Sequence, residues 1–162
     1  MPHPMRAFDI APAKTDDDVA AVIGLFRDYA AALPVSLAYQ DFASELAGLP
    51  GKYTPPAGAL LLARGSEGAP LGCVALRATQ LDGHCEMKRL FLVPAARGMG
   101  LGKALAEAAI AEARRLGYAE LRLDTLPTMQ TAQRLYGQLG FRRIAPYYGP
   151  VPEGTVFMAL TL

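Results

Sequence analysis

The stretch that decides the fold is Arg97-Gly98-Met99-Gly100-Leu101-Gly102-Lys103. It lies between an apolar segment that ends at Val93-Pro94 and an alanine-rich segment that runs to Leu116. Glycines in a strand-to-helix turn let backbone N–H groups approach an anion, and the positive end of the helix dipole then faces that anion. The stretch therefore predicts a phosphate or pyrophosphate site at the start of a helix that begins at Gly100 or Gly102.

Three anion-binding patterns compete for this stretch. A Walker A loop requires GxxxxGK followed by Ser or Thr, whereas Ala104 follows Lys103 here. A Rossmann fingerprint requires GxGxxG, whereas the three glycines are spaced GxGxG, although Asp124 stands roughly where that fold expects an acidic residue. The third pattern, (Q/R)xxGx(G/A), is matched completely by Arg97-x-x-Gly100-x-Gly102.

Upstream of the glycines, the sequence predicts two helices and an antiparallel meander. Thr15 or Asp16 is expected to cap a helix whose apolar residues continue at helical spacing until Pro34. A second helix is predicted over 37–46. Strands are predicted over 8–10, 59–64, 71–79 and 85–93, with short turns between the last three. Such a meander before the glycine-rich turn is wrong for a Rossmann fold.

Downstream, strands and helices alternate. Strand 85–93, the helix after the glycines and a strand over 121–124 form a βαβ unit, so these two strands should be parallel. A helix over 128–139 and strands over 141–144 and 155–160 complete the chain. We therefore predict one α+β domain over 1–162. It would have a mixed sheet of six to seven strands, with an antiparallel N-terminal meander plus the βαβ unit, flanked by about four helices.

Composition excludes several classes of protein. The chain has 162 residues, the length of one domain. Its residues are 52% hydrophobic and 19% charged, a balance that excludes intrinsic disorder. The formal net charge of +1 offers no electrostatic footprint for nucleic acid or an anionic membrane. No apolar run approaches the roughly 20 residues of a membrane helix.

The cysteines and the N-terminus indicate a reduced compartment. Cys73 and Cys85 are too few for a disulfide scaffold and lack the CxxC spacing of a zinc site, so we expect no metal. The sequence Met1-Pro2-His3-Pro4 lacks the pattern of a signal peptide. We therefore expect a cytoplasmic protein. Abundant alanine and a preference for arginine over lysine suggest a GC-rich, bacterial genome.

The segment from Glu86 to Phe141 resembles the core of the GNAT superfamily of acyl-CoA-dependent N-acyltransferases. Two motifs in the correct order and spacing carry the resemblance, and together they cover about a third of the chain. They are the strand Arg89-Leu90-Phe91-Leu92-Val93-Pro94 with the loop Arg97-x-x-Gly100-x-Gly102, and the closing sequence Ala132-x-x-Leu135-Tyr136-x-x-Leu139-Gly140-Phe141.

The resemblance implies that the chain binds acetyl-CoA as co-substrate. Backbone N–H groups of the loop would hold the pyrophosphate, and a strand edge would hydrogen-bond the pantetheine arm as an added strand. Residues of the helix over 128–139 would line the gap that admits this arm. Where the family often has Asn, this chain has Met129, which makes the gap more apolar. The implied cofactor-binding residues are Leu90, Phe91, Leu92, Arg97, Gly98, Met99, Gly100, Leu101, Gly102, Lys103, Met129, Ala132 and Tyr136.

The resemblance also suggests two catalytic groups. An amine has a pKa of about 10.4, so it must lose a proton before it attacks the thioester. Glu86 stands eleven residues before Arg97, like the base of the histone-modifying branch; its alternative role is an ion pair with Lys88 or Arg89. Tyr136 occupies the family's position for the proton donor to the leaving thiolate; its alternative role is a core aromatic residue.

Other residues are candidates for acceptor binding. Lys88 and Arg89 should point to opposite faces of one strand, where one of them could recognise a carboxylate or form a structural pair. Cys85 could carry an acyl group in a ping-pong mechanism, or it could be a buried thiol. The aromatic candidates are Tyr147 and Tyr148 before the last strand, for acceptor specificity or a dimer contact, and Tyr29, Tyr39 and Phe42 on the first two helices.

The function we predict is acetyl transfer from acetyl-CoA to a primary amine in a ternary complex, without an acyl-enzyme. The acceptor is expected to be a small molecule, with neither nucleic acid nor membrane as partner, and a homodimer is possible. Three alternatives remain open: a CoA-binding sensor module of the same fold, a protein N-terminal or lysine acetyltransferase, and a nucleotide-binding enzyme.

Overall fold

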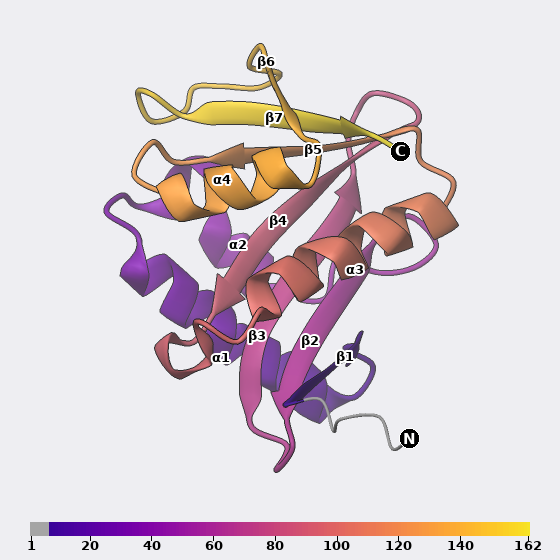
Figure 1. Ribbon diagram of the computed structural model, residues 1–162, viewed down its shortest axis with the longest axis vertical. Coiled ribbons are helices and arrows are strands. Elements are labelled where there is room, and N and C mark those ends of the chain that lie inside the picture. The colour runs from indigo at the N-terminus through magenta and orange to yellow at the C-terminus, as the bar shows by residue number, and fades with distance from the viewer. Residues whose placement is uncertain (1–6) are drawn as a thin grey trace.

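A computed structural model describes residues 7–162 and every side chain in them except that of Tyr39. Residues 1–6, with His3 and the N-terminal sequence considered above, lie outside the described residues. In the described part of the chain, seven strands form one mixed sheet in the order β1-β2-β3-β4-β5-β7-β6, with helices on both faces (Figure 1). The elements are β1 Phe8–Pro12, α1 Asp16–Ala32, the 3₁₀ helix η1 Leu37–Gln40, α2 Phe42–Ala47, β2 Ala59–Gly65, β3 Pro70–Ala78, β4 His84–Leu92, the 3₁₀ helix η2 Pro94–Ala96, α3 Leu101–Arg115, β5 Glu120–Thr125, α4 Gln130–Gln138, β6 Arg142–Ile144 and β7 Val156–Thr161.

The first helix begins where the sequence predicts. Thr15 accepts a hydrogen bond from the Asp18 N–H, and the Asp18 carboxylate accepts one from the Thr15 N–H, which makes a reciprocal capping box. Val22, Leu25 and Phe26 turn inward and pack against β2 and β3. These contacts form the core beneath one face of the sheet.

The second helix differs from the prediction over 37–46. Asp41 adopts a left-handed conformation with φ of 54° and divides the segment into η1 and α2. A short polar side chain tolerates this conformation better than most residues, so Asp41 can end one helical turn and begin the next at a new angle. The break directs Gln40 toward the centre of the sheet, where it reaches Asp124 and Tyr148.

The parallel pairing of β4 with β5 is confirmed, but it is brief. It runs from His84 opposite Glu120 to Glu86 opposite Arg122, and no further pair follows. On its other side β4 remains paired with β3 as far as Leu92. One edge of β4 beyond Glu86 is therefore unpaired within residues 7–162, and β4 and β5 diverge from that point.

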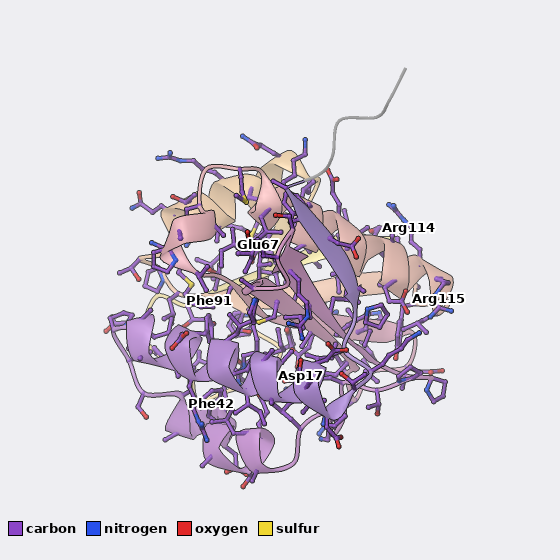
Figure 2. The ribbon with its side chains drawn as sticks, turned by 90° about the horizontal axis from the view of Figure 1, so that it is seen from below. Asp17, Phe42, Glu67, Phe91, Arg114 and Arg115 are labelled. Atoms are coloured by element: carbon purple, nitrogen blue, oxygen red, sulfur yellow. The ribbon has the colours of Figure 1, made fainter. Side chains whose placement is uncertain are left out.

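The two faces of the sheet carry different helices. Helices α1 and α2 lie on one side of the strands, and α3 and α4 lie on the other (Figures 1 and 2). Leu101, Leu105 and Ala109 of α3 pack against the sheet together with Met87, whereas Phe91 belongs to the core under α1. Arg114 and Arg115 stand at the exposed end of α3 (Figure 2). The gap between the diverging strands β4 and β5 links the α1–α2 side of the sheet to the α3–α4 side.

A β-bulge in β4 corrects the expectation that Lys88 and Arg89 point to opposite faces. The register between β3 and β4 shifts at this point, and Arg89 has a φ of 61°. Arg89 pairs with Glu45 of α2, while Lys88 pairs with Asp124, which also contacts η1. The extra residue of a bulge interrupts the alternation of a strand. Both cations therefore lie on the α1–α2 side.

Replacing Gly24 by alanine is expected to raise the free energy of unfolding by about 0.5–1 kcal/mol. Gly24 lies in the middle of α1 on its exposed side, and an added Cβ would meet nothing within 4 Å. The gain arises because alanine loses less backbone entropy than glycine when the helix forms. Urea unfolding measures it, and a lower midpoint for Gly24→Ala would contradict it.

Among the described residues, none of the helices combines the length and the apolar character needed to cross a bilayer.

Candidate active site

A cavity of about 730 Å³ opens where β4 and β5 diverge. Its walls come from α1, η1, β4, the glycine loop, the N-terminus of α3, β5 and α4. This volume is in the usual range for small-molecule pockets. The glycine loop, the unpaired edge of β4 and the buried charges on the α1–α2 side therefore share one cavity.

The glycine loop has the backbone shape that an anion site needs. Gly98 and Gly100 have positive φ values of 84° and 79°, conformations that are strained for other residues. Gly100 is the N-cap of α3, so the first N–H groups of that helix, from Leu101 to Lys103, lack partners within the helix. Arg97 and Lys103 add positive charge at the cavity wall. This cradle fits the pyrophosphate of coenzyme A.

The strand edge and α4 fit the pantetheine arm. Leu90 and Leu92 line the cavity on the part of β4 that β5 leaves unpaired. An extended amide chain could hydrogen-bond there as an added strand. Met129 and Ala132 line the opposite wall, and the Thr125 hydroxyl donates to the Met129 sulfur at 3.4 Å. The Met129 thioether is thus engaged with the protein itself.

Tyr136 is buried on α4 and lines the cavity. Its ring packs against Phe141 with centroids 5.6 Å apart. Within residues 7–162, its hydroxyl has no hydrogen-bond partner. Burial raises the pKa of Tyr136 above the ordinary tyrosine value, and the nearby charges of Tyr29 and Asp124 raise it further. The hydroxyl therefore keeps its proton at neutral pH.

Glu86 is buried and bound within the protein. Its Oε1 lies 2.7 Å from both Nε and an Nη of Arg77, and its Oε2 accepts a hydrogen bond of 2.7 Å from Tyr147. The nearest cavity-lining charge is Lys88, whose Nζ is 4.0 Å from Oε1. Glu86 itself is not among the residues of the cavity wall. Glu86 thus lies beside the cavity, and Lys88 stands between the two.

Asp124 is a cavity residue that the sequence analysis considered only for the rejected Rossmann pattern. It accepts hydrogen bonds from the Tyr148 hydroxyl at 2.5 Å and from Gln40 at 3.4 Å, and its Oδ1 lies 3.4 Å from the Nζ of Lys88. The sequence signal for Asp124 is the alternation of apolar and charged residues along 121–124. This alternation places Asp124 on the same face of the strand as Arg122. Only the register of β4 against β5 brings it opposite Lys88.

Arg89 reaches the cavity wall from a buried ion pair. Its guanidinium makes hydrogen bonds of 2.9 and 3.1 Å to the two oxygens of Glu45, which also accepts from the Tyr53 hydroxyl. The guanidinium lies over the rings of Tyr29 and Phe42. This arrangement holds the charge of Arg89 in place at one end of the cavity.

Most of the predicted site residues come together. Leu90, Phe91, Leu92, Arg97, Gly98, Gly100, Leu101, Gly102, Lys103, Met129, Ala132, Tyr136, Tyr29, Lys88 and Arg89 line the cavity. The others do not: Met99 is exposed, Glu86, Tyr147 and Tyr148 lie behind the wall, and Phe42 contacts Arg89 without lining the cavity. Tyr147 and Tyr148 hold Glu86 and Asp124, respectively. The predicted role of Tyr39 stays a prediction, because the structure does not describe the side chain of this residue.

Cys85 is a buried thiol. It is fully inaccessible, and its Sγ faces the backbone oxygen of Glu120. Burial, and then the charge of Glu86, raises the pKa of Cys85 to about 12. Because the thiolate is the nucleophilic form, this thiol is poorly suited to carry an acyl group. Within residues 7–162, no three His, Cys, Asp or Glu side chains are grouped so that they could hold a metal ion.

Comparison with known proteins establishes the family. The sequence pattern of the acetyltransferase (GNAT) family matches residues 36–141, a range that includes the glycine loop and Tyr136. The chain belongs to the GNAT family of acetyltransferases. This confirms the resemblance seen in the sequence, and the protein is an acyltransferase.

Individual relatives extend the match beyond the core motifs. The acetyltransferase is 39% identical over 154 residues to an uncharacterised N-acetyltransferase of Schizosaccharomyces pombe, over 94% of each chain. It is 31% identical over 127 residues to human N-acetylaspartate synthetase, over 77% of this chain and 41% of that protein. Its fold matches Salmonella typhimurium yncA, solved with its cofactor acetyl-CoA, with a TM-score of 0.68 and 23% identity over 96% and 94% of the two chains.

Proposed function

We propose that this acetyltransferase moves the acetyl group of acetyl-CoA to the primary amine of a small molecule by direct attack in a ternary complex. Acetyl-CoA supplies the acetyl group as an activated thioester. The loop from Arg97 to Lys103 binds the pyrophosphate, and the edge from Leu90 to Leu92 positions the pantetheine arm. A backbone N–H of this edge would stabilise the oxyanion that forms during attack.

The observation that carries this proposal is the cavity that joins the two sides of the sheet. The anion cradle opens on the α3–α4 side, whereas Lys88, Arg89 and Asp124 lie on the α1–α2 side. Two reactants entering from opposite sides would meet where β4 and β5 diverge. Tyr136 lines that region with a protonated hydroxyl, so it can donate a proton to the departing thiolate.

Two features favour a small acceptor over a protein substrate. Lys88 and Arg89 on the acceptor side are buried, Asp124 is partly buried, and Tyr29, Leu37 and Gln40 line the same cavity. A flexible peptide segment would have to reach past this wall to present its amine beside these charges. In addition, the name of the human relative, N-acetylaspartate synthetase, describes acetylation of a free amino acid.

A thiol-release assay tests the proposal directly. The purified protein is incubated with acetyl-CoA and a panel of amino acids, polyamines, aminoglycosides and peptide N-termini, and free CoA is measured. Thermal unfolding is followed in parallel with acetyl-CoA, ATP or NAD. We expect stabilisation by acetyl-CoA alone and turnover with a subset of small amines. Acetyl-CoA binding without turnover would favour the sensor module, and stabilisation only by a nucleotide would favour a nucleotide-binding enzyme.

Replacing Glu86 by glutamine tests its predicted role as base. The amide keeps the shape of the side chain and can still accept from Tyr147, so the change removes mainly the charge. If Glu86 is the base, the substitution should lower kcat about 100-fold or more. An unchanged rate and pH profile would leave Glu86 as the ion-pair partner of Arg77.

A further inference from the structure

Lys88 has more hydrogen-bonding capacity than the protein uses. Its side chain is 4% exposed and its ammonium carries three donors. Within residues 7–162 it makes one hydrogen bond, of 3.4 Å, to Oδ1 of Asp124. Oε1 of Glu86 lies 4.0 Å away, and the Tyr148 ring centroid lies 5.2 Å away. Buried charged groups normally have close partners, so this ammonium is placed to meet a ligand acceptor in the cavity that it lines.

The neighbouring charges are committed more fully than Lys88. Arg89 makes two hydrogen bonds to Glu45, at 2.9 and 3.1 Å. Glu86 is held by Arg77 and Tyr147 at 2.7 Å. Lys88 and Asp124 are joined by a longer hydrogen bond than either of these pairs. A ligand can therefore insert most readily between Lys88 and Asp124.

The position of this pair is set by the sheet. Glu86 and Arg122 form the last paired position of β4 and β5, and Lys88 and Asp124 stand two residues beyond it on the two diverging strands. They face each other across the opening where the amine must attack. The carboxylate of Asp124 also lies near enough to Tyr136 for its charge to act on that hydroxyl.

The balance of charge limits the ligand. Lys88 and Asp124 together are neutral, so a ligand of zero net charge can join them without adding net charge to a buried site. A simple monoamine would place its ammonium beside Lys88 without compensation, and a polyamine would add more positive charge. A ligand with both an ammonium group and a carboxylate offers each member of the pair an opposite charge.

We infer that the acceptor is a zwitterion of the α-amino-acid type, whose ammonium group is received by Asp124 and whose carboxylate is received by Lys88. This inference rests on the proposed function and names its substrate class. In such a ligand the two charges are separated by one carbon, which suits a protein pair whose own charged atoms are 3.4 Å apart. Lys88 then discriminates between acceptors, and Asp124 orients the amine toward the thioester.

The first experiment compares matched acceptors with the unmodified enzyme. A set of free α-amino acids is assayed beside the corresponding α-amino acid amides, with free CoA as the readout. The amide carries a less basic amine, so chemistry alone favours the amide. We expect kcat/KM for the acids to exceed that for the amides roughly tenfold or more, the size of a lost hydrogen bond to a charged group.

Two variants then separate the roles of the pair. We expect Lys88→Gln to reduce the acid-over-amide ratio to one or below while the KM for acetyl-CoA is unchanged, and Lys88→Arg to retain a preference for acids. We expect Asp124→Asn to lower kcat/KM for acids and amides alike. Lys52→Gln, which alters an exposed lysine outside the cavity, is the matched control and should change none of these values.

The outcomes distinguish this inference from the proposed function. Acids and amides acetylated equally, or a preference for acids that survives in Lys88→Gln, would overturn the inference and leave the acetyltransferase proposal intact. Failure to acetylate any amine despite acetyl-CoA binding would overturn both. Because the acid-over-amide comparison needs only the unmodified protein, the inference can be tested even if the variants fold poorly.

Discussion

Tyr136→Phe is expected to lower kcat about 10²–10⁴-fold, the usual contribution of a positioned proton donor. A proton given to the sulfur as the C–S bond of the tetrahedral intermediate breaks lets CoA leave as the thiol. Tyr136 lines the cavity with a raised pKa and, among the described residues, no hydrogen-bond partner of its own. Phenylalanine preserves the ring contact with Phe141, so acetyl-CoA affinity should stay within a few-fold.

Stability measurements separate this role from packing. Since the hydroxyl has no partner in residues 7–162, its removal should leave the urea midpoint nearly unchanged. Tyr118→Phe is the matched control, because its hydroxyl bonds the backbone of Ala57 outside the cavity wall. That control should retain full kcat. A Tyr136→Phe enzyme with kcat within threefold of the unmodified protein would show that Tyr136 is only a core residue.

Glu45→Ala is expected to destabilise the fold by about 3–5 kcal/mol, the cost of leaving a buried charge unpaired. The Arg89 side chain is 2% exposed, and Glu45 provides both of its hydrogen-bonded oxygens. The substitution also removes the acceptor of the Tyr53 hydroxyl. The loss should appear in the free energy of unfolding obtained from urea titration.

Two further variants make the comparison specific. Asp17, labelled in Figure 2, forms an exposed ion pair with Arg64, so Asp17→Ala should cost less than about 1 kcal/mol. Combining Glu45→Leu with Arg89→Met should recover much of the stability, because apolar residues can replace a buried ion pair. A cost for Glu45→Ala no larger than that for Asp17→Ala would mean that the Arg89 charge finds another partner.

Local features of the site could be predicted because they depend on neighbours in the chain. The glycine spacing predicted a helix that begins at Gly100 or Gly102, and Gly100 is the N-cap of α3. Thr15 predicted the N-terminus of α1 in the same way. Helix caps and strand-to-helix turns are determined within a few residues, so residue types at short spacing suffice to identify them.

Longer-range features could not be predicted from the sequence, because they arise from the pairing of strands and from β-bulges. The expected partners of Glu86 were its strand neighbours, whereas its closest charged partner is Arg77, directly opposite on β3. The bulge at Arg89 put Lys88 and Arg89 on the same side of the sheet, whereas strand alternation predicted opposite sides. A strand pattern gives alternation only while the strand is regular, and register with the next strand is a property of the whole sheet.

The sequence by itself determined the anion cradle, the order of the elements and the family, because each is written in short motifs and periodicities. The tertiary structure alone decided which charges meet in the cavity. Lys88 and Asp124 are 36 residues apart, and only the early end of the β4–β5 pairing places them face to face. Their contact is energetically important because both groups are removed from water. A charge that water would solvate in an extended chain needs a partner of opposite charge inside the protein.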